Sequence, residues 1–349
     1  VKNLFIWDDT KKIQKKYKLP PSIKTFSNSL NFVDYIILSP GININKSKIK
    51  KKLIKNKQKI ITDIDLFYMS NDNIKSIVVT GSNGKSTTCK LIEHILKKSK
   101  FKTQIGGNIG KPILSLKKAK KNIFIIEASS FQLAYSKYIK PTYAIMLNIS
   151  RDHLDWHRTV QNYINAKFKI FSLQDKKDYS FLLDSKLLRL YKKIKFLGKL
   201  KTIKLKSFKN IKNKIKNKYL ISKINEENMS FVYELSKLLK IQKNNFISQA
   251  NTFKGLPHRF EFFYQKKSIK FINDSKATSF EASKLGLQTN KNILWIVGGL
   301  PKLKDNFNLN VIKSNVIKSY IIGNHVNFFS KKFKNKIKFK ITKNLKSSL

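Results

Sequence analysis

The stretch Thr80-Gly81-Ser82-Asn83-Gly84-Lys85-Ser86-Thr87 is a glycine-rich turn between an expected strand and an expected helix. The strand is the apolar run at 77–79, and after the turn apolar residues recur every three to four positions, as on one face of a helix. Such a turn directs backbone N–H groups at a phosphate, with a lysine for the β- and γ-phosphates and a hydroxyl for Mg²⁺. A strict phosphate-loop signature would have glycine at Val79, so only its Gly-Lys-Ser half matches. The flanking strand and helix favour a nucleotide-phosphate site over a turn with an incidental lysine.

Apolar runs elsewhere indicate an α/β protein built on buried parallel strands. Each run precedes a turn or a polar residue, and continuous apolar strands that alternate with helices are typical of parallel sheets. Two runs follow Pro257 and predict a further α/β domain there, whereas the lysine-rich stretch 176–222 shows no clear period. The runs lie at 35–38, 123–126, 144–147, 293–297 and 320–322.

Length and charge limit the possible functions. The chain has 349 residues, enough for two or three domains, and 73 Lys and Arg against 20 Asp and Glu give a formal net charge of +53. A basic nucleic-acid-binding protein is one interpretation, but the excess is lysine spread along the chain rather than arginine clustered with aromatic residues. A genome rich in A and T would also impose this composition. The charge alone therefore does not decide between these explanations.

Cysteine content and hydropathy narrow the class further. The single cysteine, Cys89, excludes a disulfide framework and a multi-cysteine metal site within this chain. No apolar run approaches the roughly 18 residues that a membrane-spanning helix needs. We therefore expect a cytoplasmic protein without a membrane span.

Polar residues follow two of the expected strands. Glu127 ends the run at 123–126, and His153 comes shortly after the run at 144–147. Ligands of open parallel sheets collect at the carboxyl ends of strands, and carboxylate and hydroxyl oxygens suit Mg²⁺. Glu127 and Ser86 would thus form one magnesium site, while a histidine such as His153 is by itself more often structural.

Lys167 lies in an unusual place. It falls within the apolar stripe of the expected helix at 160–171. A lysine on a buried face is costly unless it is paired or modified. In so lysine-rich a chain, chance placement is the alternative explanation.

Together these residues resemble the Mur ligases of peptidoglycan synthesis, and among them the members that add D-glutamate. The phosphate loop is common to all Mur ligases and to folylpolyglutamate synthases, whereas the motifs at 255–261 and 272–278 are specific to D-glutamate addition. The other shared motifs are Ser39-Pro40-Gly41, Gly106-Gly107-Asn108-Ile109-Gly110, Glu127-Ala128-Ser129-Ser130-Phe131-Gln132-Leu133, Asp152-His153 and Ala166-Lys167.

The resemblance implies a three-domain α/β fold. It predicts a partial Rossmann-like UDP-binding domain at 1–63, a central parallel-sheet phosphate-loop ATPase domain at 64–255, and a partial Rossmann-like C-terminal domain at 256–349. The family's glycine-rich first turn would precede Val1, and its D-glutamate-binding loop would follow Leu349, so the sequence is expected to be truncated at both ends.

The implied activity is ATP-dependent ligation of D-glutamate to UDP-N-acetylmuramoyl-L-alanine through an acyl phosphate. Two Mg²⁺ ions, a carbamylated Lys167 and a monomeric state without nucleic acid belong to this expectation. Another Mur ligase or a folylpolyglutamate synthase-like ligase is the alternative within the fold, and a nucleic-acid-binding protein is the alternative of another class.

Residue roles are likewise implied by the resemblance. The expected catalytic residues are Lys85, His153, Lys167 and Lys276. The expected ATP-binding residues are Gly81, Ser82, Asn83, Gly84, Lys85, Ser86, Thr87, Asn225, Arg259 and Asp274. The expected metal ligands are Ser86 and Glu127 at one site, and His153 and Lys167 at the other. The expected substrate-binding residues are Asp8, Ser39, Pro40, Gly41, Asn108, Thr278 and Lys302. The sequence departs from the family pattern at two positions. Ile224 stands where the family usually has histidine, and Leu300 stands where some members have an acid, which affects the expected adenine and D-glutamate contacts.

Overall fold

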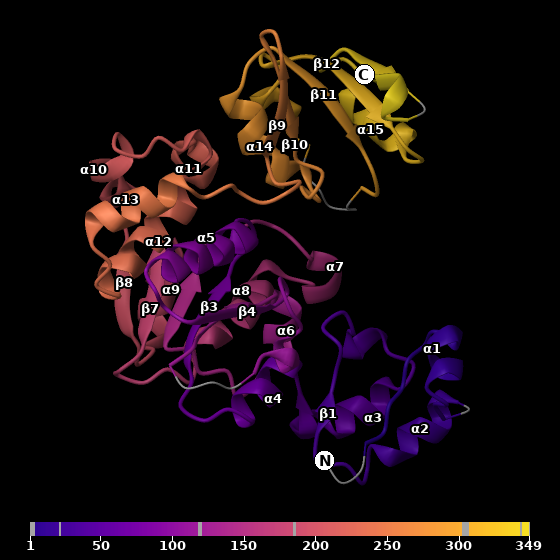
Figure 1. Cartoon of the computed structure of the whole chain (residues 1–349). Coiled ribbons are helices and arrows are strands. Elements are labelled where there is room, and N and C mark those ends of the chain that lie inside the picture. The colour runs from indigo at the N-terminus through magenta and orange to yellow at the C-terminus, as the bar shows by residue number, and fades with distance from the viewer. Residues whose placement is uncertain are drawn as a thin grey trace.

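A six-stranded parallel sheet forms the centre of the computed structural model, which describes residues 4–20, 22–117, 121–183, 186–301, 307–342 and 344–348. Its strand order is β4-β5-β3-β6-β7-β8, and every neighbouring pair is parallel. The sheet lies in the middle part of the molecule, between the N-terminal and C-terminal parts (Figure 1). The expected α/β class is thereby confirmed. The strands are β3 (Lys75–Thr80), β4 (Thr103–Gly107), β5 (Ile123–Glu127), β6 (Tyr143–Met146), β7 (Tyr179–Leu183) and β8 (Lys199–Ile203).

Helices cover both faces of this sheet because its strands are apolar on both sides. Along β3, Ile77 and Val79 enter one hydrophobic cluster and Val78 enters the other, as the alternation of strand side chains requires. Cys89 in α5 and Phe231 in α12 pack in the first cluster. The first layer consists of α5 (Lys85–Lys98), α12 (Glu226–Leu238) and α13 (Lys243–Asn251). The second consists of α4 (Asp63–Met69), α6 (Ser130–Tyr135), α8 (Val160–Phe168) and α9 (Lys186–Ile194).

The lysine-rich stretch that showed no period is part of this layered fold. It contains β7, α9 and β8, followed by the short helices α10 (Lys209–Lys212) and α11 (Lys218–Ile221). Strand β8 is an edge strand on which Lys199 and Lys201 are exposed. An edge strand needs only part of its surface buried, so lysines replaced the apolar pattern there.

The N-terminal part has its own small core. Strands β1 (Ile36–Ile37) and β2 (Ile60–Ile61) pair in parallel, and Leu30, Leu38 and Leu53 pack around them. The expected strand at 35–38 is thus present but shorter. The helices of this part are α1 (Lys11–Lys16), α2 (Ile23–Ser29) and α3 (Lys50–Lys55).

The C-terminal part is α/β, as the late apolar runs predicted. Its parallel sheet has the order β11-β12-β13, and a separate antiparallel hairpin, β9 with β10, comes before it in the chain. Phe280, Ile321 and Phe333 lie in its core. Its elements are β9 (Glu261–Lys266), β10 (Ile269–Asn273), α14 (Phe280–Thr289), β11 (Ile293–Gly298), β12 (Val316–Ile322), α15 (Val326–Phe333) and β13 (Phe339–Ile341).

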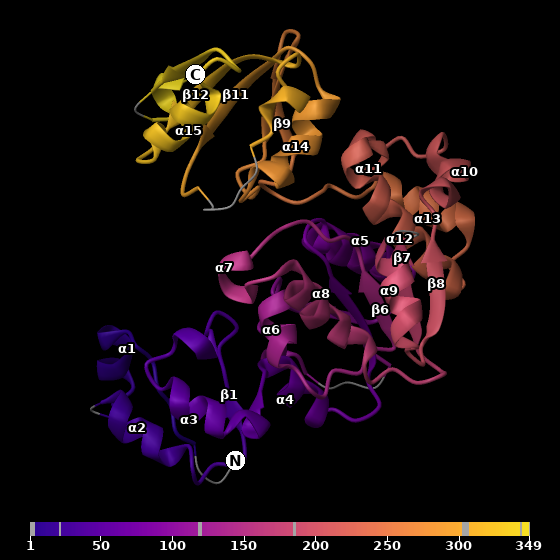
Figure 2. The same ribbon diagram turned by 180° about the vertical axis from the view of Figure 1, so that it is seen from behind.

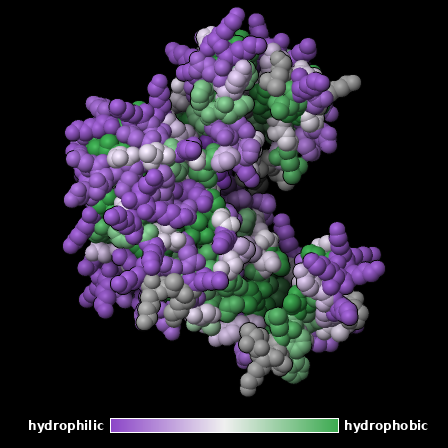
Figure 3. Space-filling view, in the orientation of Figure 1, coloured by the Kyte–Doolittle hydropathy of each residue, from purple (hydrophilic) through white to green (hydrophobic). Residues whose placement is uncertain are grey.

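The N-terminal and C-terminal parts lie apart from each other, with the central sheet joining them (Figures 1 and 2). The space-filling view shows a hollow between these two parts, on the side of the molecule that carries α7 (Leu154–His157) (Figures 1 and 3). No helix within the described residues is long and apolar enough to cross a membrane.

Candidate nucleotide and active site

The glycine-rich turn connects the end of β3 to the start of α5, as expected. Gly84 occupies the N-cap position of α5 with φ +83°, a conformation that glycine adopts at little cost. A Cβ atom on Gly84 would lie 2.3 Å from Oδ1 of Asn228, so α12 presses directly on the turn. Glycine is therefore required at this position by both backbone conformation and space.

The turn is also held from the end of β6. The backbone N–H of Ser82 donates to the carbonyl oxygen of Asn148 at 2.9 Å, and that of Asn83 donates to Oδ1 of Asn148, also at 2.9 Å. Nδ2 of Asn148 donates to the carbonyl oxygen of Asn83 at 3.2 Å and to Oε1 of Glu227 at 2.7 Å. Sequence reasoning assigned no role to Asn148 or Glu227. The position of Asn148 directly after a buried strand was a usable signal, whereas Glu227 reaches the turn only because α12 packs there.

Lys85 is the first residue of α5, and its side chain folds back onto the glycine-rich turn. Its Nζ donates to the carbonyl oxygens of Gly81 and Ser82, each at 2.9 Å. Burial lowers the pKa of Lys85, and the nearby carboxylate of Glu127 opposes that shift. The ammonium group is thus placed where it can meet a phosphate oxygen.

Glu127 offers a free oxygen next to the turn. Its side chain is 1% exposed at the end of β5, and Oε1 accepts a hydrogen bond from Nδ2 of Asn108 at 2.7 Å. Oε2 is buried and has no hydrogen-bond partner among the described residues. A buried carboxylate oxygen without a donor is costly unless a cation binds it, so this position fits Mg²⁺.

The start of the C-terminal part reaches the phosphate turn through Arg259. Its Nη2 donates to Oγ of Ser86 at 3.0 Å. Nearby, the backbone N–H of Phe260 donates to Oδ1 of Asp274 at 2.9 Å, while burial raises the pKa of Asp274 to about 6. The backbone N–H of Lys276 donates to the carbonyl oxygen of His258, which precedes Arg259, at 3.0 Å. These bonds fix the two motifs of the C-terminal part against each other.

An open cavity of about 690 Å³ lies between the central and C-terminal parts. Ile224, which stands where the family has histidine, also lines it. The cavity brings together most of the expected site residues, namely Ser82, Asn83, Gly84, Lys85, Ser86, Thr87, Asn108, Glu127, His153, Asn225, Arg259, Asp274, Lys276 and Thr278.

Lys167 lies behind the phosphate turn and does not line the cavity. Its side chain is 1% exposed, and Nζ donates to the carbonyl oxygen of Gly81 at 2.8 Å and to Oγ1 of Thr80 at 3.2 Å. Nζ also stands 4.8 Å from the ring centre of Tyr163, whose hydroxyl is 3.0 Å from Oγ of Ser82. Burial holds the pKa of Lys167 well below its ordinary value. Burial therefore disfavours the charged form of its amine relative to that of an exposed lysine.

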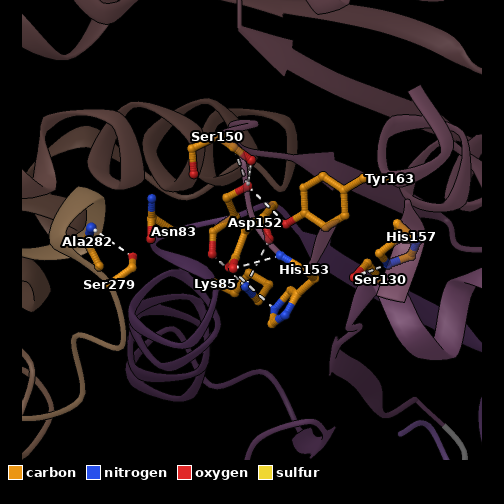
Figure 4. Close-up of polar contacts among 12 residues, drawn as sticks. Asn83, Lys85, Ser130, Ser150, Asp152, His153, His157, Tyr163, Ser279 and Ala282 are labelled. Carbon is orange, nitrogen blue, oxygen red and sulfur yellow. Dashed lines mark hydrogen bonds and ion pairs between the residues drawn. The ribbon is translucent and has the colours of Figure 1, made fainter. Parts of the chain in front are cut away.

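His153 lies next to this group, at the N-cap of α7. It has φ +53°, and its Nε2 is 3.4 Å from Oδ2 of Asp152. Figure 4 shows Lys85, Asp152 and His153 close together, with Tyr163 beside them. No group of three or more His, Cys, Asp and Glu side chains in the described parts of the chain is arranged to hold a metal ion. The expected metal ligands instead combine one hydroxyl, one carboxylate, one imidazole and one lysine.

Gly81, Asp8 and the turn at 39–41 are also expected in the site, but they do not line the cavity. Asp8 caps a local turn by accepting the N–H of Thr10 at 2.7 Å. Ser39, Pro40 and Gly41 form a turn of the N-terminal part that does not line the cavity, and Lys302 lies outside the described residues.

Comparisons with known proteins agree with this arrangement. Residues 79–242 match the Mur ligase middle domain. The UDP-N-acetylmuramoylalanine–D-glutamate ligase of Rickettsia felis is 34% identical over 335 residues, which cover 90% of this chain and 74% of the relative. The enzyme of the same name from Francisella tularensis is 32% identical over 329 residues, covering 91% and 76%.

Solved structures show the same fold at low sequence identity. MurF ligase from Thermotoga maritima in complex with ADP superposes with a TM-score of 0.59 at 14% identity and 88% coverage of both chains. MurC from the same organism gives 0.57 at 17% identity, covering 98% of this chain and 84% of that one. E. coli FolC in complex with DHPP and ADP gives 0.56 at 12% identity, covering 89% and 91%. With curated relatives above 30% identity matched over about three quarters of their own length, the chain belongs to the Mur ligases and, within them, to the UDP-N-acetylmuramoylalanine–D-glutamate ligase family.

Proposed function

We propose that the chain joins D-glutamate to UDP-N-acetylmuramoyl-L-alanine in an ATP-dependent, amide-forming step of peptidoglycan precursor synthesis. The observation that carries this proposal is the bond of Arg259 to Ser86, which brings the C-terminal part onto a phosphate turn beside Glu127. An enzyme that couples ATP to amide formation needs these elements in one cavity. The match to relatives of that name over most of the chain supports the choice of substrates.

In the first step, the alanyl carboxylate attacks the γ-phosphate of ATP, forming an acyl phosphate and releasing ADP. Charge spreads over the phosphoryl oxygens in such transfers, so positioning and neutralisation supply most of the catalysis. We assign neutralisation to Lys85 and Arg259, and phosphate binding to those backbone N–H groups of the turn at 81–87 that do not donate to Asn148. Asn225 lies 1% exposed beside this turn and would contact ATP.

Two magnesium sites belong to the proposal. Ser86 and Glu127 would hold one ion, and His153 with a modified Lys167 would hold the other. Bound Mg²⁺ would neutralise phosphate charge and orient the oxygens. Asn108 donates to Oε1 of Glu127, which leaves Oε2 available to bind an ion.

We further propose that Lys167 is carbamylated. A neutral amine adds to CO₂ with release of one proton, and the product carries carboxylate oxygens in place of a cation. Lys167 is buried, takes part in none of the ion pairs found within the described residues, and has a strongly lowered pKa. An ammonium cannot ligate Mg²⁺, whereas a carbamate can.

In the second step, the amine of D-glutamate attacks the acyl carbonyl and phosphate leaves. We place Asp274, Lys276 and Thr278 on the C-terminal side of this reaction, with Lys302 near the D-glutamate carboxylate. Asp8 and Ser39-Pro40-Gly41 would contact the UDP end, and Asn108 the muramoyl part. The proposed enzyme has three domains, at 1–63, 64–255 and 256–349. We propose that it acts as a monomer in the cytoplasm.

Phosphate release tests the ATP site. It should require both UDP-N-acetylmuramoyl-L-alanine and D-glutamate, and Lys85→Ala should abolish it because the charge next to the γ-phosphate is lost. Lys97→Ala is the matched control, since Lys97 lies on the same helix, is exposed, and pairs only with Glu93 among described residues. Unchanged turnover of Lys85→Ala would refute the assignment.

The carbamate has its own test. Lys167→Ala should lose activity and regain part of it with short carboxylic acids, which can fill the space with oxygens. Lys169→Ala is the control, because Lys169 donates to the carbonyl oxygens of Ala134 and Ser136 and should not be rescued. Independently of activity, protein equilibrated with ¹³CO₂ should show a carbamate carbon signal that is absent from Lys167→Ala. A missing signal in the wild type would overturn this part of the proposal.

A further inference from the structure

Helix α7 connects the N-terminal part to the candidate active site. Trp156 on this helix donates from Nε1 to the carbonyl oxygen of Gly41 at 3.3 Å, and its own carbonyl oxygen accepts from Nδ2 of Asn43 at 3.0 Å. We name these two contacts the Trp156 clasp. They join residues more than 110 positions apart in the chain, and they hold the turn at 39–41 that the proposed function assigns to the UDP end.

A third bond strengthens this contact. The N–H of Ile44 donates to the hydroxyl oxygen of Tyr135 at 3.1 Å, and the ring of Tyr135 lies 5.5 Å from that of Trp156. The N-terminal turn therefore meets α6 and α7 together rather than one side chain alone.

Aromatic packing ties α7 to the interior. The ring of Phe131 stands edge-on to Trp156 at 5.2 Å and to His153 at 4.6 Å. His157, also on α7, has its ring centre 4.6 Å from that of Trp156. Its Nε2 forms a hydrogen bond with Oγ of Ser130 at 2.9 Å (Figure 4). A single helical turn packed among rings shifts as one body rather than deforming. A displacement at Trp156 would thus be passed to His153 at the N-cap.

We infer that Trp156 is a positioning residue that couples the turn at 39–41 to His153. When a nucleotide sugar binds against the turn, the clasp holds α7 in place and His153 in its working position. Trp156 touches no reacting atom, and its effect runs through the backbone of Gly41 and through α7. This inference rests on the proposed function for the identity of the ligand at the turn.

Substitution of Trp156 by phenylalanine isolates the clasp. Trp156→Phe keeps an aromatic ring among Phe131 and Tyr135 but removes the N–H that binds Gly41. One neutral hydrogen bond corresponds to between about twofold and tenfold in affinity. We expect the KM for UDP-N-acetylmuramoyl-L-alanine to rise by that factor and the KM for ATP to stay within about twofold. Trp295→Phe, which changes the same residue type in the C-terminal core, should leave both values within about twofold.

Fluorescence gives a readout that does not depend on activity. The chain has three tryptophans, so Trp7→Phe combined with Trp295→Phe leaves Trp156 as the sole reporter. Addition of UDP-N-acetylmuramoyl-L-alanine should change the Trp156 emission, because the ligand contacts the turn that the indole N–H binds. ATP alone should change it less.

Calorimetry separates the two proposals. If the wild-type protein does not bind UDP-N-acetylmuramoyl-L-alanine, the proposed function is wrong. The coupling then also lacks its premise, which is a nucleotide sugar bound at the turn. If binding is normal but Trp156→Phe leaves the KM unchanged and the Trp156 emission does not respond, the coupling alone is overturned. An equal rise in the KM of every substrate would also overturn it, since that pattern indicates general loosening.

Discussion

Replacement of Gly84 by alanine tests whether α12 shapes the phosphate turn. Gly84 has φ +83°, and the new Cβ would lie 2.3 Å from Oδ1 of Asn228. Real Cβ contacts are never that short, so Asn228 would have to move. Its Oδ1 accepts from Oγ1 of Thr88 at 3.2 Å, and its Nδ2 donates to Oδ1 of Asn225 at 3.1 Å. The substitution therefore combines backbone strain with the loss of two buried hydrogen bonds.

The expected cost follows from these contacts. A left-handed backbone conformation costs a residue with a Cβ roughly 1–2 kcal/mol. Two hydrogen bonds at about 1 kcal/mol each bring the sum to roughly 3–4 kcal/mol. In the nucleotide-free variant the glycine-rich turn can relax, and nucleotide binding must then restore its strained conformation. A cost of about 3 kcal/mol on binding weakens the nucleotide affinity more than 100-fold.

The assay is calorimetric binding of a non-hydrolysable ATP analogue, with urea unfolding of the same samples. Gly323→Ala is the matched control: Gly323 has φ +84°, and the nearest atom to its new Cβ would be 3.8 Å away. It should carry the strain alone and leave nucleotide affinity unchanged. Adding Asn228→Ala to Gly84→Ala should recover part of the loss by removing the clash. Wild-type affinity in Gly84→Ala would refute the reasoning.

Three further predictions concern other contacts. Asp65 is fully buried and accepts five hydrogen bonds, so Asp65→Asn should lower the free energy of unfolding by roughly 2–4 kcal/mol in urea titrations. Asp175→Asn should change it little, because the side chain of Asp175 is half-exposed and forms only a surface ion pair with Lys140. Arg259→Ala should raise the KM for ATP roughly tenfold or more by removing the charged donor to Ser86, with Arg259→Lys intermediate, and an unchanged KM would contradict the site. Burial, with His153 and Lys167 nearby, lowers the pKa of His157 from 6.5 to about 4, so the native state favours the neutral ring. The contribution of the neutral ring to stability is complete above pH 6.5 and is lost as the pH falls toward 4. The urea midpoint of His157→Gln should therefore fall less over this pH range than that of the wild type.

The central features of the fold were predictable because their causes are local. The apolar runs at 123–126 and 144–147 needed burial on both faces, and the turn at 80–87 needed a strand before it and a helix after it. Glu127 could be placed at the sheet edge by the same reasoning, because it ends a strand beside β3.

Other contacts could not be predicted because they depend on how distant segments pack. Glu227 lies at the turn only through the docking of α12 and the orientation of the Asn148 amide. Trp156 and Gly41 are 115 positions apart, and no periodicity relates them. Strand β8 could not be recognised from the sequence because lysines interrupt its apolar residues. It lies at the sheet edge, where a strand pairs with one other strand only and needs no continuous apolar pattern.

The most direct test of the proposed activity is chromatographic detection of the nucleotide-sugar product with ATP, Mg²⁺ and UDP-N-acetylmuramoyl-L-alanine, varying the acceptor among D-glutamate, L-glutamate, L-alanine and D-alanyl-D-alanine. We predict a new UDP-linked product with D-glutamate only, together with one phosphate released per product formed. Product with another acceptor, or ATP hydrolysis that is indifferent to the acceptor, would contradict the account.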